Sequence, residues 1–216
     1  MLSCWLSCQV VVGLLILASC TPAVTPPPNV TPRGEDRYLI DPRAGSPAAD
    51  PQTEQKLDAA WRFALAGNEA EARRLLDEIR KKNPGYAPAS LVQAAIDIRA
   101  NRFDAARAIV QKYDTLAARV YEAEIAFREN DTRRALELYR TLEVPAAPER
   151  IAVLENTLYE QLFAAAQTAP DAQAIPLLRE ALTFKPAAIE PRIQLARRLV
   201  TQRSFDDARR ELEPLL

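Results

Sequence analysis

Five alanines recur at near-regular intervals along the chain, and their spacing limits what the chain can fold into. They are Ala72, Ala106, Ala135, Ala174 and Ala208, separated by 34, 29, 39 and 34 residues, with a mean period of 34. Residues that are mostly large and apolar follow each alanine at four and seven positions. Because positions i, i+4 and i+7 share one face of a helix, this pattern indicates a chain built from repeated helical units.

The sequence around each alanine predicts a hairpin of two helices. In the first copy, Gly67-Asn68 forms the turn and Asn83-Pro84 ends the second helix, because proline cannot continue a helix. A small residue where two helices cross allows their axes to approach to about 8–10 Å. The expected helix pairs cover residues 54–66 and 69–82, 88–100 and 103–112, 116–129 and 132–143, 148–168 and 171–184, and 190–202 and 205–216.

This pattern resembles the tetratricopeptide-repeat family. The strongest matches are the turn at Gly67, the anchor Ala72, and the endings DEIRKKNP at Pro84 and LLREALTFKP at Pro186. The resemblance covers about residues 53–216 and implies an all-α fold, a right-handed α-solenoid of about five helix hairpins. The later copies lack the turn glycine, and a generic bundle of amphipathic helix hairpins is the alternative.

The N-terminus has the features of a secretory signal. Val10–Ala18 is an apolar run that is too short to span a bilayer. The sequence LASC, which ends at Cys20, resembles the lipobox of bacterial lipoproteins and implies that residues 1–19 are a signal peptide and that Cys20 is lipidated. Met1–Gln9 contains no Lys or Arg, so an uncleaved anchor helix or a buried helix is the alternative. Thr21 implies a place in the bacterial cell envelope on the outer membrane, facing the periplasm, rather than on the inner membrane.

Residues 20–52 are rich in proline and poor in apolar side chains. Residues 21–52 contain eight of the 17 prolines of the chain. Such a composition buries too little surface to offset the entropy of ordering, so we expect 20–52 to be a disordered tether. The cluster Tyr38-Leu39-Ile40 allows an alternative, in which it docks onto the first repeat. In a further alternative, the linker fills the groove of the solenoid, which then serves as a structural spacer.

By the family resemblance, the first helix of each pair lines the concave face, where partners bind. The apolar, aromatic and arginine side chains expected on that face suit an amphipathic helix or an extended segment with apolar anchors. The lysines and asparagines of the family's carboxylate clamp are absent from these positions. The alternative is that the aromatic residues belong to the core. The expected groove residues are Leu57, Trp61, Leu65, Leu91, Ala95, Ile98, Arg99, Val120, Glu124, Phe127, Arg128, Tyr159, Phe163, Gln167, Ile193, Arg197 and Val200.

The composition argues against several classes of function. The chain has no histidine, its three cysteines all lie in the first twenty residues, and 28 Lys and Arg balance 29 Asp and Glu. These features argue against a metal site, a disulfide framework and a nucleic-acid partner. Since no phosphate loop or nucleophile motif occurs, we expect neither a cofactor nor an enzyme activity. We expect a lipid-anchored scaffold that binds other envelope proteins or peptides. The alternative is the N-terminal adaptor region of a longer enzyme or of a secretion or envelope-assembly component, with its chemistry beyond residue 216.

Overall fold

The structure, a computed structural model, describes residues 26–32 and 34–216. The expected signal peptide and Cys20 lie outside the described residues. The described part contains ten α-helices and no strand, and none of its helices is long and apolar enough to cross a membrane. The helices are α1 (Pro51–Leu65), α2 (Glu69–Lys82), α3 (Ala87–Arg99), α4 (Phe103–Val110), α5 (Leu116–Arg128), α6 (Thr132–Tyr139), α7 (Ala147–Thr168), α8 (Asp171–Phe184), α9 (Ile189–Thr201) and α10 (Phe205–Leu212).

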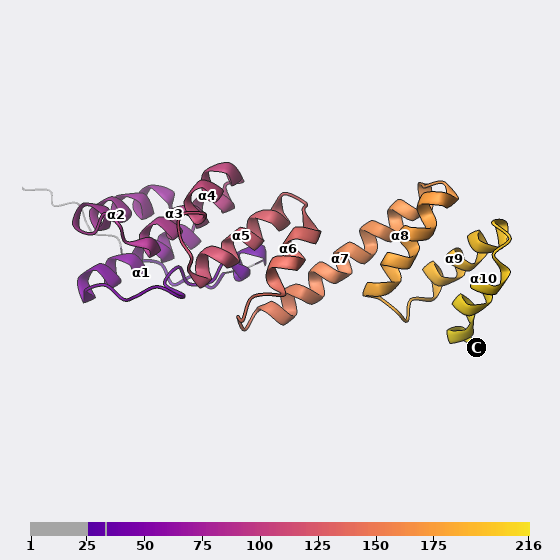
Figure 1. Cartoon of the computed structure of the whole chain (residues 1–216). Coiled ribbons are helices and arrows are strands. Elements are labelled where there is room, and N and C mark those ends of the chain that lie inside the picture. The colour runs from indigo at the N-terminus through magenta and orange to yellow at the C-terminus, as the bar shows by residue number, and fades with distance from the viewer. Residues whose placement is uncertain (1–25, 33) are drawn as a thin grey trace, which may run out of the picture.

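The helices form an α-solenoid of five hairpins, as the repeat pattern predicts. Each odd-numbered helix packs against the even-numbered helix that follows it, and successive hairpins stack in one direction from α1 to α10 (Figure 1). The observed helices lie within a few residues of the predicted ranges, and α7, with 22 residues, is the longest of them. An α-helix of that length is about 33 Å long, so α7 reaches beyond its own hairpin.

Four of the five turns share one backbone geometry. Gly67, Asn101, Asn130 and Arg203 have positive φ angles of 82°, 58°, 66° and 61°. The amide after each of them donates to the carbonyl five positions earlier at 2.8–2.9 Å, the bond that closes a helix with a left-handed residue. Glycine and asparagine adopt this conformation readily. The replacements of the turn glycine therefore preserve the turn in these copies.

The five anchor alanines lie where the repeat pattern predicts a helix crossing. Four of them have no exposed surface and Ala208 is 3 % exposed. The core around them divides within α7. One cluster of buried residues extends from Leu39 to Leu158, and another from Ala166 to Ala208. The two halves of the solenoid thus have largely separate cores, joined along one long helix.

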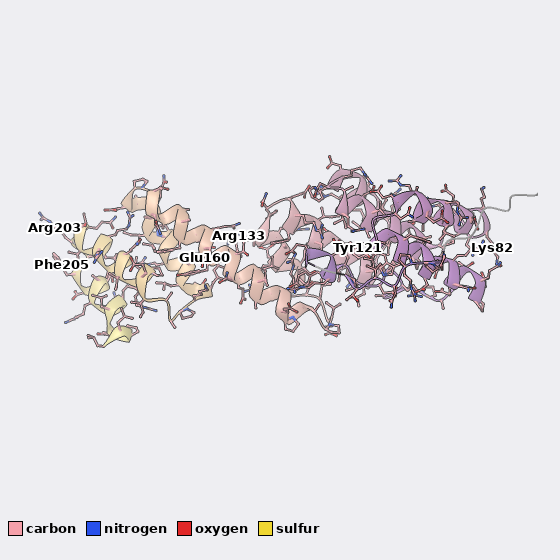
Figure 2. All side chains as sticks on the ribbon, turned by 180° about the vertical axis from the view of Figure 1, so that it is seen from behind. Lys82, Tyr121, Arg133, Glu160, Arg203 and Phe205 are labelled. Atoms are coloured by element: carbon pink, nitrogen blue, oxygen red, sulfur yellow. The ribbon has the colours of Figure 1, made fainter. Side chains whose placement is uncertain are left out.

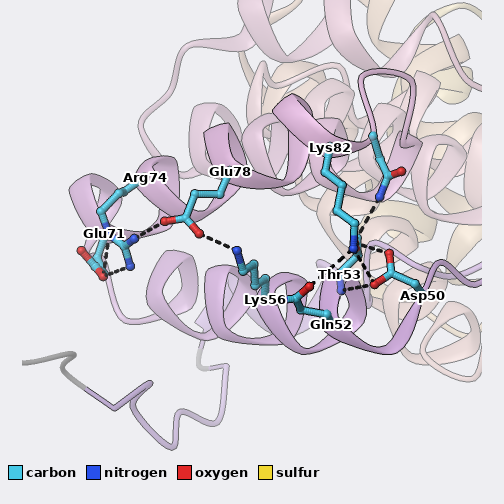
Figure 3. A network of polar contacts seen from close by, with 9 residues as sticks. Asp50, Gln52, Thr53, Lys56, Glu71, Arg74, Glu78 and Lys82 are labelled. Carbon is cyan, nitrogen blue, oxygen red and sulfur yellow. Dashed lines mark hydrogen bonds and ion pairs between the residues drawn. The ribbon is translucent and has the colours of Figure 1, made fainter.

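Charged residues close the N-terminal edge of the solenoid (Figure 3). Asp50 caps α1 by accepting from the Thr53 amide at 3.3 Å, and it also accepts from the Thr53 hydroxyl at 2.6 Å and pairs with Lys82 of α2 at 2.9 Å. The Thr53 hydroxyl and Lys82 hold the pKa of Asp50 well below its usual value. Lys56 and Glu78 pair across the same two helices at 2.6 Å. A polar outer edge of this kind is what a terminal repeat needs for solubility.

The expectation of a disordered tether is wrong for residues 34–50. Gly34–Tyr38 forms a short 3-10 helix, and the Tyr38 and Leu39 side chains are only 2 % and 3 % exposed. The tether was inferred from the average composition of 20–52, but the few apolar residues there are adjacent and dock together. The cluster Tyr38-Leu39-Ile40 does dock, but onto the third and fourth hairpins instead of the first repeat: the carbonyl of Ile40 accepts from Tyr121, and Tyr38 stacks on Arg150. The neighbouring Asp36 pairs with Arg99 of the second hairpin.

We predict that Ala135→Leu lowers the free energy of unfolding by about 1–3 kcal/mol, because its side chain is fully buried and a larger one overpacks the helix crossing. Ala165→Leu, at an exposed position of α7, is the matched control and should change it by no more than about 0.5 kcal/mol. Urea unfolding followed by circular dichroism measures both. Equal midpoints for the two variants would contradict the role of the anchor alanines.

Candidate functional site

The structure places about half of the expected groove residues in the core. The first helix of a hairpin packs against its own second helix on one side and against neighbouring hairpins on the other, so both of its apolar faces are covered. Eight of the expected residues therefore belong to the core instead of an open groove, with at most 9 % of each exposed. They are Leu57, Trp61, Leu91, Ala95, Ile98, Val120, Glu124 and Tyr159.

The N-terminal segment, defined as residues 34–46, covers the face of α3, α5 and α7 on which the groove was expected. The Tyr121 hydroxyl donates to the carbonyl of Ile40 at 2.8 Å. The amide of Ala117 donates to the carbonyl of Ala44 at 3.1 Å. Ala117 lies in the first turn of α5, where an amide has no acceptor within the helix, so the segment supplies the missing partner.

Two arginines expected at the rim of the groove bind this segment. The Asp36 carboxylate accepts from Nε of Arg99 at 2.8 Å and from Nη2 of Arg128 at 3.1 Å. Arg99 also donates to the carbonyl of Ala64, at the end of α1. One carboxylate of the segment therefore joins α3 to α5, and both arginines already have an intramolecular partner.

At the centre of the contact lies Arg150, on α7, which has no exposed surface. Its Nε and Nη2 each donate to one oxygen of the Glu124 carboxylate at 2.9 Å, and its Nη1 lies 2.6 Å from the Glu35 carboxylate. The guanidinium stacks between the rings of Tyr38 and Phe127, with its carbon 4.1 and 3.9 Å from their centres. Cations over aromatic faces gain most when they are desolvated, as here.

Arg150 is not among the residues expected in the groove. The available signal was Glu124, a carboxylate expected on the inner face of α5, which needed a partner if it was buried. Nothing in the periodicity showed that the partner would come from the first turn of α7, because Arg150 precedes the apolar stripe of that helix.

Burial and ion pairing oppose each other in this cluster. Burial raises the pKa of Glu124, against the lowering effects of Arg150 and of the hydroxyl of Tyr139, which donates to it at 2.7 Å. Burial lowers the pKa of Arg150, but the charges of Glu124 and Glu35 outweigh it and raise the pKa overall. Burial and the Glu124 carboxylate raise the pKa of Tyr139. Arg150 therefore stays charged, and Tyr139 keeps the proton that it donates.

Two aromatic residues expected in the groove, Tyr159 and Phe163 on α7, pack together and against α8. Their rings are stacked with centres 6.0 Å apart. The ammonium of Lys185 lies 4.2 Å from the centre of the Tyr159 ring. Their main contacts are within the fourth hairpin and at its junction with α9, so they stabilise the joint between hairpins.

The fifth hairpin, in contrast, exposes apolar side chains. Ile189, Ile193, Ala196 and Val200 follow one another on α9 at spacings of four, three and four residues, so they form one stripe, in which Ala196 is buried and Ile193 is half-buried. Ile189 is 60 % exposed and Val200 49 %. Phe205, at the start of α10, is 61 % exposed and lies at the tip of the molecule (Figure 2). We call these five residues the terminal stripe.

A hollow of about 310 Å³ opens beside the terminal stripe. It is lined by Ile193, Ala196, Arg197, Val200 and Leu212, so α9 and α10 both contribute to it. The structure thus brings together the three residues that the sequence placed on the inner face of the fifth hairpin, namely Ile193, Arg197 and Val200. An apolar floor with one exposed cation suits a helix or a peptide better than a small polar ligand.

The described residues contain no group of His, Cys, Asp and Glu side chains that could hold a metal ion.

Comparison with known proteins gives a match to a protein family. Residues 63–119, from the end of α1 into α5, match the family model of the tetratricopeptide repeat. No curated protein and no solved structure matches the chain.

We predict that Glu124→Gln lowers the free energy of unfolding by about 3–5 kcal/mol, because it leaves the buried guanidinium of Arg150 without its main countercharge. Glu122→Gln is the matched control. Its carboxylate is 39 % exposed and pairs with Arg134, so the loss should stay below about 1 kcal/mol. Adding Arg150→Met to Glu124→Gln should recover part of the loss. Denaturant unfolding of the four proteins measures this, and equal losses for the two single variants would contradict it.

Proposed function

Because the chain carries tetratricopeptide repeats, we propose that it is a protein-interaction scaffold of the bacterial cell envelope, held to a membrane by a lipid on Cys20 and binding partner proteins through its terminal stripe. No part of this role needs catalysis. The partner that we propose is an amphipathic helix, which would place its own apolar face against α9 and α10.

The observation that carries this proposal is the exposure of the terminal stripe. Monomeric proteins seldom leave contiguous large apolar patches in water, and such patches commonly mark interaction sites. The stripe has the spacing of one helix face, which a second helix can pack against along its length. Burying a side chain such as Ile189, Val200 or Phe205 contributes about 1.5–3 kcal/mol. Three such anchors are enough to offset much of the cost of association.

The lipid anchor rests on the sequence around Cys20, and the docked N-terminal segment shortens the tether. Between Cys20 and Gly34 there are only 14 steps along the chain, which reach about 50 Å at full extension. We therefore propose that the solenoid lies close to the lipid surface. The residue after the cysteine, Thr21, favours the outer membrane and its periplasmic face.

A second candidate function is supported by the same stripe. In the earlier hairpins, the corresponding apolar face of the first helix is covered by neighbouring parts of the chain. The stripe on α9 therefore also suits a further repeat or domain, as in an adaptor region of a longer enzyme or envelope-assembly component. The two candidates differ in whether the stripe contacts another protein or more of the same chain.

We predict that a photoreactive amino acid at Val200, in cells that naturally make the protein, gives discrete covalent adducts of higher mass with one or a few proteins. The same group at Asp104, a fully exposed position of α4, is the control and should give none. Phe205→Asp should weaken the adducts from position 200, because it places a charge on the stripe. Adducts that form equally from both positions would contradict the scaffold proposal, and a crosslink within one chain would favour the adaptor.

We predict that Cys20→Ala removes lipid from the protein and moves it from the membrane fraction to the soluble fraction of a bacterial host. Cys8→Ala, a cysteine that precedes the lipobox, should change neither property. Labelling with a fatty-acid analogue and fractionation measure both. Label that is retained in Cys20→Ala would contradict the proposed anchor.

A further inference from the structure

The contact between the N-terminal segment and the solenoid is built on a charge balance. Three buried or half-buried arginines, Arg99, Arg128 and Arg150, come from α3, α5 and α7. The helices themselves supply one carboxylate among them, that of Glu124, and the segment supplies the other two, from Glu35 and Asp36. One further helix carboxylate, Glu149 of α7, pairs with Arg37 of the segment at 2.9 Å. Without the segment, Arg99 and Arg128 would lose the carboxylate that they share, and Arg150 would lose one of its two.

Apolar and aromatic contacts accompany these charges. Tyr38 covers the guanidinium of Arg150 with its ring, and its hydroxyl donates to Glu149 of α7 at 3.3 Å. Leu39 joins the main core cluster. The face therefore contacts the segment through two acids, a basic residue, an aromatic ring and an aliphatic side chain, in that order. The basic residue, Arg37, is exposed and pairs with Glu149 of α7 at 2.9 Å.

The segment is held at its far end by backbone contacts. Gly45 has a φ of +79°, and a Cβ there would lie 2.6 Å from the amide nitrogen of Leu116, so the chain passes close to the start of α5. Only two backbone hydrogen bonds, those to Ile40 and Ala44, join the described part of the segment to the helices. Side chains thus make most of the contacts, as in a bound peptide.

We propose that this face of α3, α5 and α7 is a peptide-binding site that the chain occupies with its own N-terminal segment. We propose that it binds extended segments of partner proteins with the same order of two acids, a basic residue, an aromatic residue and an aliphatic residue. The partner displaces the segment and takes over its ion pairs. This site is separate from the terminal stripe, so it goes beyond the function proposed above.

The attachment of the segment sets how tightly an outside peptide can bind. A short tether gives the segment an effective concentration of about millimolar at its own site. The apparent affinity for a free peptide falls in proportion to the fraction of molecules whose site is open. Substitutions that weaken the contact of the segment with the helices, but leave the helices unchanged, should therefore increase the affinity of the chain for a free peptide with the sequence of the segment.

The test uses the full chain and a fluorescent synthetic peptide with the sequence of residues 34–46. The double variant Asp36→Asn with Tyr38→Ala weakens the segment only, and it should bind the peptide at least about tenfold more tightly than the wild type in fluorescence anisotropy. A peptide with the same two substitutions is the matched control and should not bind. Adding Arg128→Ala to the variant chain should abolish the gain. Equal affinity of wild type and variant, or no binding by either, would overturn the proposal.

Hydrogen exchange in the wild-type chain decides the matter if the double variant does not fold. The amide of Ala117 depends on the Ala44 carbonyl, so its exchange reports release of the segment. If the Ala117 amide exchanges with a smaller opening free energy than the amides in the middle of α5, the result supports a displaceable segment. If the Ala117 amide exchanges only when the whole chain unfolds, the segment is a permanent part of the core and the proposal is overturned. Either result leaves the adducts from Val200 unaffected, so the two proposals fail independently.

Discussion

The N-terminal half of this molecule depends on one buried charge, the guanidinium of Arg150. A cation removed from water costs several kcal/mol unless opposite charges and hydrogen bonds surround it. Here the helices provide Glu124 and the ring of Phe127, and the N-terminal segment provides Glu35 and the ring of Tyr38. Neither source alone encloses the guanidinium. The docking of the segment and the packing of α5 against α7 are therefore two parts of one electrostatic requirement.

Much of the fold could be predicted because it repeats. The anchor alanines and the turns recur, so a local substitution such as Arg203 for the turn glycine does not hide the period. The docked segment could not be predicted in the same way, since it occurs once and its contacts join residues far apart in sequence, such as Asp36 and Arg128. The prediction that residues such as Leu91 line an open groove was wrong for a related reason. Periodicity shows which faces of a first helix are apolar, as at Leu91, but not which of them a neighbouring hairpin covers.

The division of the core within α7 gives the two halves different properties. The first half has a continuous core that includes Leu39 of the docked segment, whereas the second has a smaller cluster around Leu178 and Leu195. In a solenoid each hairpin gains stability from its neighbours. The hairpin of α9 and α10 packs mainly on α8, and Arg198 adds a hydrogen bond to the Ala166 carbonyl at the end of α7. We expect this hairpin to open most easily, which suits a surface that adapts to a partner.

The positions of the anchored end and of the terminal stripe also indicate what kind of partner the stripe contacts. The described chain begins beside the first hairpins, and α10 lies at the opposite end of the array (Figure 1). A lipid on Cys20 would therefore hold the end at α1 and α2 near the membrane, with the stripe directed away from it. An apolar patch that served to bind the same bilayer would be useful at the anchored end, where charged pairs such as Lys82 with Asp50 lie instead. The position of the stripe thus favours a protein partner over a second membrane contact.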